Sequence, residues 1–128
     1  MKIYLSSWVG NCVVLRGIRD ELVKRGHTVT SRWIDVGARP DKDMKAFWEE
    51  WVVKDVEDLD ACDTLVVYTN DSYGEGRSLG GMRFEEGYAY ARGKKIIVVG
   101  PRICIFDQLK DIRYFFTWEQ FFTGIKNP

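Results

Sequence analysis

The chain has 128 residues, of which 45% are hydrophobic, and its 19 Lys and Arg residues balance its 19 Asp and Glu residues. A chain of this length and composition is expected to form one domain, residues 1–128, with a substantial core. The lack of a basic excess argues against nucleic acid as a partner, and no apolar run approaches the length of a membrane span, so small molecules and other protein chains remain.

The first predicted elements are a strand and a helix. Residues 2–7 form an apolar run typical of a short buried strand. Residues 12–25 predict a helix, since apolar residues recur there at helical spacing, and Gly26 suits the left-handed position that often ends a helix. The face expected to pack inward consists of Val14, Leu15, Ile18 and Leu22.

A second strand and a long helix come next. Residues 28–34 alternate and are rich in β-branched side chains, which predicts a strand, and residues 43–62 predict a helix. The apolar stripe of this helix consists of Met44, Phe47, Trp48, Trp51, Val52, Val56 and Leu59. Asp55 falls in the middle of that stripe, where an acid buried without a partner is costly. We therefore expect Asp55 either to line a pocket or to form a buried pair with a cation such as Arg32.

The second half of the chain predicts two more strands, residues 63–69 and 95–100, with a helix over residues 81–92 between them. The loop of residues 70–80 is polar, glycine-rich and long for an α/β connection. Such loops more often belong to a site than serve as spacers.

Beyond Pro101 the pattern is weaker. Residues 105–109 suggest a helical turn, residues 114–116 a fifth strand, and Thr117 the N-cap of a short last helix. The aromatic residues of this tail exceed what one sheet edge needs, and we interpret part of them as the subunit interface of a homo-oligomer, a dimer or larger. They are Tyr114, Phe115, Phe116, Trp118, Phe121 and Phe122.

Strands separated by helices predict an α/β fold, with a parallel sheet, helices on both faces and right-handed crossovers. For five strands the expected architecture is a single flavodoxin-like domain with strand order 2-1-3-4-5. Loops 6–11 and 70–81 then face each other across the crevice where the strand order reverses, which is where such sheets bind ligands.

Two neighbouring acids compete for a role in the helix at 81–92. Glu85 is expected in its first turn, where the helix dipole favours the ionised form and where a carboxylate beside the crevice can be a nucleophile or a base. The alternative is an ordinary exposed glutamate. Glu86 points about 100° away round the helix, so only one of the two can face the crevice.

Polar and aromatic residues gather where the first strand ends, namely Tyr4, Ser6, Ser7, Trp8 and Asn11. Tyr4 can equally be a core residue, and one of the serines or Asn11 can cap the following helix. Trp33 and Trp48 are expected in the core or in the wall of a pocket, where a flat base could stack on them.

The three cysteines, Cys12, Cys62 and Cys104, form no C-x-x-C pair, and the first two lie in apolar settings typical of buried thiols. This pattern, with no signal peptide in view, favours a reduced cytoplasmic protein. The single His27 has no Cys or His nearby, so no metal site is expected.

Three motifs point to a family. An Ile-Tyr-x-x-x strand stands at residues 3–7, and Asp55 lies eight residues before Asp63, which opens the third strand. The most specific motif, Gly-x-x-x-Glu-x-Gly-Tyr-Ala-x-Ala-x-Gly-Lys, spans residues 81–94. Over about residues 1–100 the chain thus resembles the nucleoside 2-deoxyribosyltransferase family and its nucleotide N-glycosidase relatives, which have the same flavodoxin-like fold.

The resemblance implies that Glu85 is the glycosyl nucleophile, that Asp55 contacts the base and helps to protonate it, and that Tyr4 lies near the nucleophile. The residues expected to bind substrate are Ser6, Ser7, Trp8, Asn11, Asp71, Gly81 and Met82. The chain departs from the family pattern at Leu79, where the family often has an Asp, and Asp71 or Ser78 of the same loop can replace it. Family transferases also take an amide side chain from a neighbouring subunit, and no motif after residue 100 identifies an equivalent.

The expected activity is transfer of a 2-deoxyribosyl group between nucleobases through a covalent Glu85 intermediate, without metal or organic cofactor. Asp55, with a pKa raised by apolar surroundings, would protonate the departing base. One alternative is an N-glycosidase that hydrolyses a (deoxy)nucleoside 5′-monophosphate. Its phosphate needs a cradle, for which the candidates are Ser6, Ser7, Asn11, residues 74–81, Arg77 and Arg83. Alternatives of another class are a non-catalytic nucleotide-sensing domain and a flavin-binding electron carrier.

Overall fold

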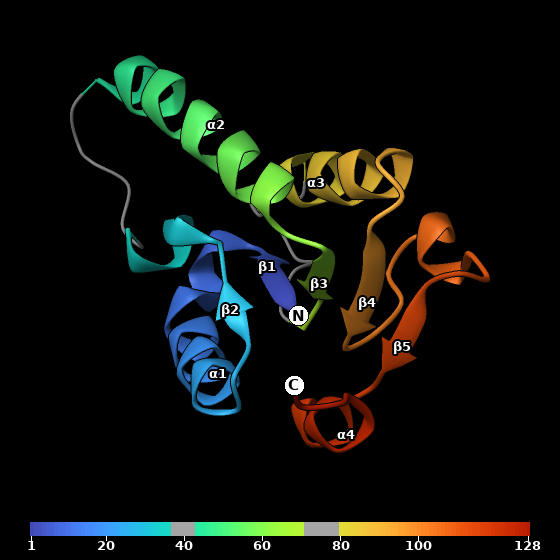
Figure 1. The fold of residues 1–128 in the computed structure, drawn as a ribbon. Helices are drawn as coiled ribbons and strands as arrows, with labels where there is room; N and C mark the ends of the chain where they lie inside the picture. Colours follow the sequence, from blue (N-terminus) through green and yellow to red (C-terminus); the bar gives the residue numbers. More distant parts are fainter. Residues whose placement is uncertain (37–42, 71–79) are drawn as a thin grey trace.

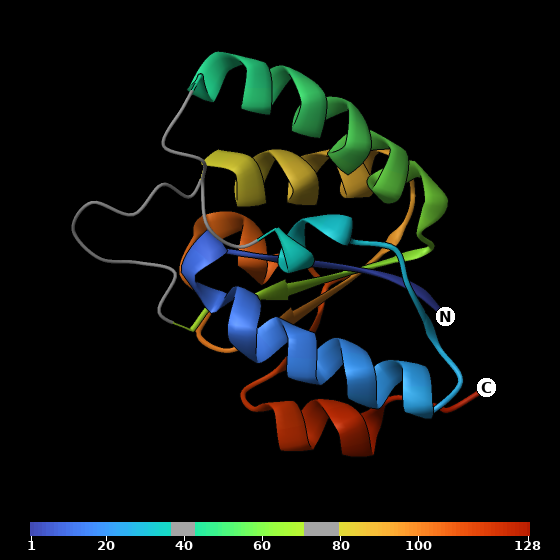
Figure 2. The same cartoon turned by 90° about the vertical axis from the view of Figure 1, so that its left-hand side faces the viewer.

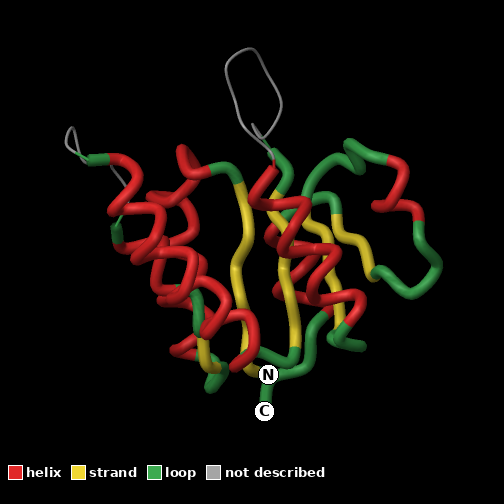
Figure 3. Tube along the Cα trace, turned by 90° about the horizontal axis from the view of Figure 1, so that it is seen from above, coloured by secondary structure: helices red, strands yellow, loops and turns green. Residues whose placement is uncertain are grey.

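The computed structural model describes residues 1–36, 43–70 and 80–128. Its sheet has five parallel strands in the order β2-β1-β3-β4-β5, which confirms the predicted flavodoxin-like arrangement (Figures 1 and 3). The strands are β1 (Lys2–Ser7), β2 (Thr28–Val29), β3 (Thr64–Tyr68), β4 (Lys95–Val99) and β5 (Arg113–Phe115). Because β1 pairs with β2 on one side and β3 on the other, the strand order reverses beside it.

Helices cover both faces of the sheet, as Figure 2 shows. One face carries α1 (Cys12–Lys24) and α4 (Trp118–Gly124), and the other carries α2 (Met44–Ala61) and α3 (Gly80–Ala91). Side chains alternate along β1, so that Ile3 and Leu5 enter the α1/α4 core while Tyr4 enters the α2/α3 core. Before its last residue, the side chains that β1 offers to α2 and α3 therefore come from even-numbered residues.

The second strand is much shorter than the predicted residues 28–34, because side chains replace its backbone pairing. Ser31 Oγ accepts a hydrogen bond from Leu5 N at 3.0 Å, and Trp33 Nε1 donates to Leu5 O at 2.8 Å. The backbone N–H and C=O of Leu5 thus have hydrogen-bond partners without a neighbouring strand. The chain then leaves the sheet and forms the 3₁₀-helix η2 (Arg32–Asp35).

The helices lie within one or two residues of the predicted bounds, and η3 (Ile105–Gln108) is the predicted turn. Gly26 follows α1 with a φ of 91°, and Thr117 Oγ1 accepts from Gln120 N at 3.2 Å as the predicted N-cap of α4. Val14 is 46% exposed and not in the core, because the inward face of α1 is centred on the buried Leu15 and Leu22. Cys12 is likewise only half-buried. None of the helices in the described ranges is long and apolar enough to cross a bilayer.

The aromatic tail packs mainly on this chain's own sheet. Phe121 is fully buried, and Phe115, Trp118 and Phe122 pack against the same core. Among these tail residues Phe116 is the one with a largely exposed ring, at 58%. The surplus of aromatic residues is therefore explained by the core beneath α4, so it no longer argues for a subunit interface, and the homo-oligomer stays a prediction.

Candidate active site

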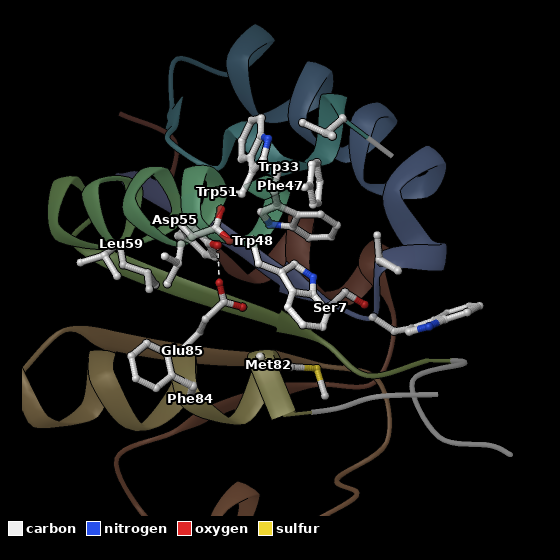
Figure 4. A pocket seen from close by; sticks show the side chains of 17 residues that line it. Ser7, Trp33, Phe47, Trp48, Trp51, Asp55, Leu59, Met82, Phe84 and Glu85 are labelled. Carbon is white, nitrogen blue, oxygen red and sulfur yellow. Dashed lines mark hydrogen bonds between the residues drawn. The ribbon is translucent and has the colours of Figure 1, made fainter. Parts of the chain in front are cut away.

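A pocket of about 440 Å³ opens between α2 and α3, beside the carboxyl end of β1. Asp55 from α2 and Glu85 from α3 point toward one another across it (Figure 4). The pocket thus lies beside the point where the strand order reverses, and Ser7, Trp8, Val9 and Gly81 line it from the two loops that the sequence places at the crevice. Two acids that lie 30 residues apart in the sequence share one hollow.

Two residues of β1 hold the carboxylate of Glu85. Ser6 Oγ donates to Oε1 at 2.9 Å, and the hydroxyl of Tyr4 donates to Oε2. Because α3 begins at Gly80, Glu85 lies in its second turn and not in the predicted first turn. Glu85 is half-buried and hydrogen-bonded, which excludes the alternative of an ordinary exposed glutamate.

Burial raises the pKa of Glu85 to about 7, and the nearby Asp55 adds to the rise, while the hydrogen bonds from Tyr4 and Ser6 oppose it. The loss of solvation on burial thus outweighs the hydrogen bonds that favour the ionised form of Glu85. Burial, with Glu85 and Asp55 nearby, also raises the pKa of the Tyr4 hydroxyl far above its usual range. Tyr4 thus stays protonated as a donor, and Glu85 changes charge near neutral pH.

Asp55 lines the pocket and is not part of an ion pair with Arg32. That guanidinium binds Asp58 instead, with Nε 2.9 Å from Oδ1, while Oδ1 of Asp55 is buried without a hydrogen-bond partner in the described structure. Burial raises the pKa of Asp55 to about 6, with Asp58 adding to the rise and Arg32 opposing it. In mildly acidic solution this carboxyl can therefore donate a proton.

Aromatic side chains form one wall of the pocket. Trp33 comes from η2, and Phe47, Trp48 and Trp51 come from α2 (Figure 4). Of the apolar stripe along α2, only Leu59 is buried, and Trp48, expected in the core or in a pocket wall, is 57% exposed. The stripe is thus mainly a pocket wall, and its flat rings offer stacking surfaces for a planar group.

The other residues expected to bind substrate divide into two groups. Those that line the pocket are Ser7, Trp8, Gly81 and Met82. Ser6 and Asn11 do not line it: Ser6 bonds to Glu85, and the Asn11 amide donates to Ser7 Oγ at 2.9 Å and to Asn70 O at 2.8 Å. Asn11 makes no side-chain cap on α1 and instead links the ends of β1 and β3. Asp71 lies outside the described residues.

Glu86 faces away from the pocket into a buried polar cluster. Arg83 Nη1 lies 3.1 Å from Glu86 Oε2 and 3.0 Å from Asp107 Oδ1. Potential metal-binding atoms of Glu86, Cys104 and Asp107 lie within 4.8 Å of one another, but the Arg83 guanidinium already binds both carboxylates. Arg83 is therefore not available as a phosphate cradle for the pocket, and Arg77, the other candidate cation, lies outside the described residues.

Sequence reasoning missed Asp58, Phe84 and Asp107. Asp58 lies off the apolar stripe of α2 but is 6% exposed, because η2 packs against that flank of the helix. Phe84 lines the pocket although its ring is mostly exposed. Its position directly before Glu85 in the most specific motif was the available signal. Asp107, buried in η3, had no periodic pattern around it to reveal it.

Three solved structures share this fold. A 2-deoxyribosyltransferase from Bacillus psychrosaccharolyticus is 23% identical, with 98% of this chain and 93% of that chain covered and a TM-score of 0.70. A CMP N-glycosidase from Clostridium botulinum is 18% identical, with 90% and 87% covered and a TM-score of 0.57. A conserved protein from Enterococcus faecalis is 24% identical, with 87% and 69% covered and a TM-score of 0.56. No protein-family model and no curated protein matches the sequence.

Proposed function

We propose that this protein is a nucleoside 2-deoxyribosyltransferase, which moves a 2-deoxyribosyl group from one nucleobase to another through an ester on Glu85. The observation that carries the proposal is the Glu85 carboxylate, held by two donors of β1 and facing Asp55 inside an aromatic pocket. Paired carboxyl groups with different roles are the usual means of retaining glycosyl transfer. The fold shared with a 2-deoxyribosyltransferase supports the same activity.

In the first half-reaction, ionised Glu85 attacks C1′ of the deoxynucleoside while the bond from C1′ to the base nitrogen breaks. The base leaves with the electron pair of that bond and takes, through Asp55, the one proton that Asp55 and Glu85 share between about pH 6 and pH 7. Tyr4 and Ser6 hold the attacking carboxylate in place. The products are a deoxyribosyl ester on Glu85, the free base and an ionised Asp55.

In the second half-reaction, a nitrogen of the acceptor base attacks C1′, and Glu85 leaves as a carboxylate. Asp55 takes the proton from that nitrogen, which restores the starting state. Water in place of the acceptor base would release free deoxyribose instead. The aromatic walls formed by Trp33, Trp48 and Trp51 reduce the room for water beside the ester, and this favours transfer over hydrolysis.

Charge favours an uncharged nucleoside over its 5′-monophosphate. Among the lining residues in the described part of the chain there is no Lys or Arg, while Asp55 and Glu85 repel a phosphate when they are ionised. Three of the candidates for a phosphate cradle are also engaged elsewhere: Ser6 by Glu85, Asn11 by its links to the ends of β1 and β3, and Arg83 by its two buried acids.

Intact-protein mass spectrometry tests the proposal. We expect a deoxyribosyl adduct when the protein is mixed with a 2′-deoxynucleoside, with peptide mapping that assigns it to Glu85. Adding a second base should discharge the adduct and yield the new nucleoside. The Glu85→Gln variant is the control and should form no adduct. An adduct on another residue, or base exchange without any adduct, would contradict the covalent route.

A nucleoside 5′-monophosphate hydrolase is the second candidate, which the fold shared with a CMP N-glycosidase supports. Parallel assays of a deoxynucleoside and its monophosphate, each with and without an acceptor base, separate the two activities. Release of base from the monophosphate alone, unaffected by the acceptor, would favour the hydrolase. Binding of either compound without turnover would favour a non-catalytic nucleotide-sensing domain.

A further inference from the structure

We propose that Ser6 is a positioning residue, whose hydroxyl fixes the plane of the Glu85 carboxylate and so aims the attacking oxygen at the sugar, without touching the substrate. This inference rests on the proposed role of Glu85 as the nucleophile. It assigns to Ser6 a task different from the substrate contact that the sequence suggests for it.

The geometry of the two donors carries the argument. Tyr4 and Ser6 lie two residues apart on β1, so both face α3, and they donate to different oxygens of Glu85. The last torsion of a glutamate has a broad, two-fold energy profile, so a single hydrogen bond leaves the carboxylate free to rock about that bond. Two donors on one strand, which is paired with β3 on one edge and held at Leu5 by Ser31 and Trp33 on the other, remove this freedom.

The burial of Ser6 separates positioning from substrate binding. Ser6 is 0% exposed and is not among the residues that line the pocket, whereas Tyr4, Ser7 and Glu85 are. The hydroxyl of Ser7 bonds to the carbonyl oxygen of Tyr68 at 2.7 Å. Adjacent serines thus serve different partners because side chains alternate along a strand, and Ser6 reaches the reaction only through Glu85.

The Ser6 hydrogen bond has an electrostatic effect as well. A donor to a carboxylate stabilises the ionised form, and the bond from Ser6 lowers the pKa of Glu85 against the larger effect of burial. Removing the hydroxyl should therefore raise that pKa. A hydrogen bond to a charged group corresponds to a change of about one pKa unit or somewhat more.

The test compares Ser6→Ala with Ser6→Cys and with Ser31→Ala as a matched control. Ser31 is also a buried serine that bonds to β1, but its Oγ accepts from Leu5 N and does not contact Glu85. The pKa of Glu85 is read directly by ¹³C NMR of protein labelled at the glutamate carboxyl carbons, with the signal assigned by its loss in Glu85→Gln. The pH dependence of kcat and KM for a deoxynucleoside is measured in parallel.

For Ser6→Ala we expect the pKa of Glu85 to rise by about one unit and kcat at its pH maximum to fall about tenfold, with KM unchanged. Ser6→Cys, a weaker donor of similar size, should fall between the wild type and Ser6→Ala, and it carries the test if Ser6→Ala does not fold. Ser31→Ala should lower stability without moving the pKa of Glu85.

Two results would overturn the inference. An unchanged pKa of Glu85 in both Ser6 variants would show that the hydroxyl does not act on the carboxylate. A raised KM with unchanged kcat would show that Ser6 contacts the substrate. A shifted pKa in a protein that never forms a deoxyribosyl ester would instead overturn the proposed function, because the NMR readout needs no substrate.

Discussion

Arg32 binds Asp58 and not Asp55, although both acids lie on α2 and are only three positions apart. Besides the contact of Nε with Oδ1 at 2.9 Å, the backbone N of Arg32 donates to Asp58 Oδ2 at 3.0 Å. The Asp58 carboxylate therefore accepts its hydrogen bonds from η2, and Asp55 is left with a buried oxygen that lacks a hydrogen-bond partner in the described structure. The structural acid and the candidate proton donor are thereby distinct residues.

Above pH 6, Asp55→Asn should raise the stability of the protein and Asp58→Asn should lower it. The pKa of Asp55 is raised to about 6 in the folded protein, so its ionisation opposes folding. This cost is absent below about pH 4, where both states are protonated, and is complete above about pH 6. With allowance for its partial exposure, Asp55→Asn should add about 1 kcal/mol at pH 8.

Asp58→Asn should instead remove about 1–2 kcal/mol at pH 8, because it weakens two hydrogen bonds from Arg32. Urea unfolding of the two variants at pH 4 and pH 8 measures both effects. A loss of stability at pH 8 in Asp55→Asn would mean that its carboxylate has a stabilising partner in solution.

Glu85→Gln should reduce deoxyribosyl transfer at least about 10³-fold, because an amide cannot form the ester. Glu86→Gln, one residue along the same helix, should retain transfer, since its side chain faces Arg83 and Asp107 on the far side from the pocket. Thermal unfolding of both variants controls for folding. If Glu86→Gln loses activity with its stability intact, the nucleophile has been assigned to the wrong residue.

The activity should depend on pH with a maximum between about 6 and 7, since the reaction needs one proton on the pair formed by Asp55 and Glu85. As pH rises, kcat/KM should increase when the first proton leaves the pair, near pH 6, and decrease when the second leaves, near pH 7. Asp55→Asn should abolish the decrease on the alkaline side and slow poor leaving bases the most. An unchanged alkaline limb would contradict the role of Asp55 as proton donor.

Trp48→Ala should raise KM for a deoxynucleoside about tenfold and change kcat less, because a stacking surface for the base is lost. Its effect on the free energy of unfolding should be small, since Trp48 is 57% exposed. Val53→Ala is the matched control, because Val53 is on the same helix and equally exposed but does not line the pocket. An equal KM for the two variants would exclude stacking on Trp48.

The strand order and the helix bounds could be predicted because they follow from local periodicity and from the rules of parallel sheets. Contacts between distant side chains could not. Residues 28–34 have the alternation of a strand, yet the side chains of Ser31 and Trp33 replace most of its pairing. Likewise, the motif located Glu85, but the sign of its pKa shift depends on its burial in the folded chain, which no local pattern reveals.

Side chains with different tasks in this pocket come from separate elements. The donors to Glu85 stand on β1, where a slip of one residue would exchange Tyr4 and Ser6 for Leu5 and Ser7. Insertions into residues 2–7 should therefore be selected against strongly. The half-exposed rings of α2 are under no such constraint, so under the proposed function substitutions on α2 should change which bases are accepted while the reaction chemistry stays intact.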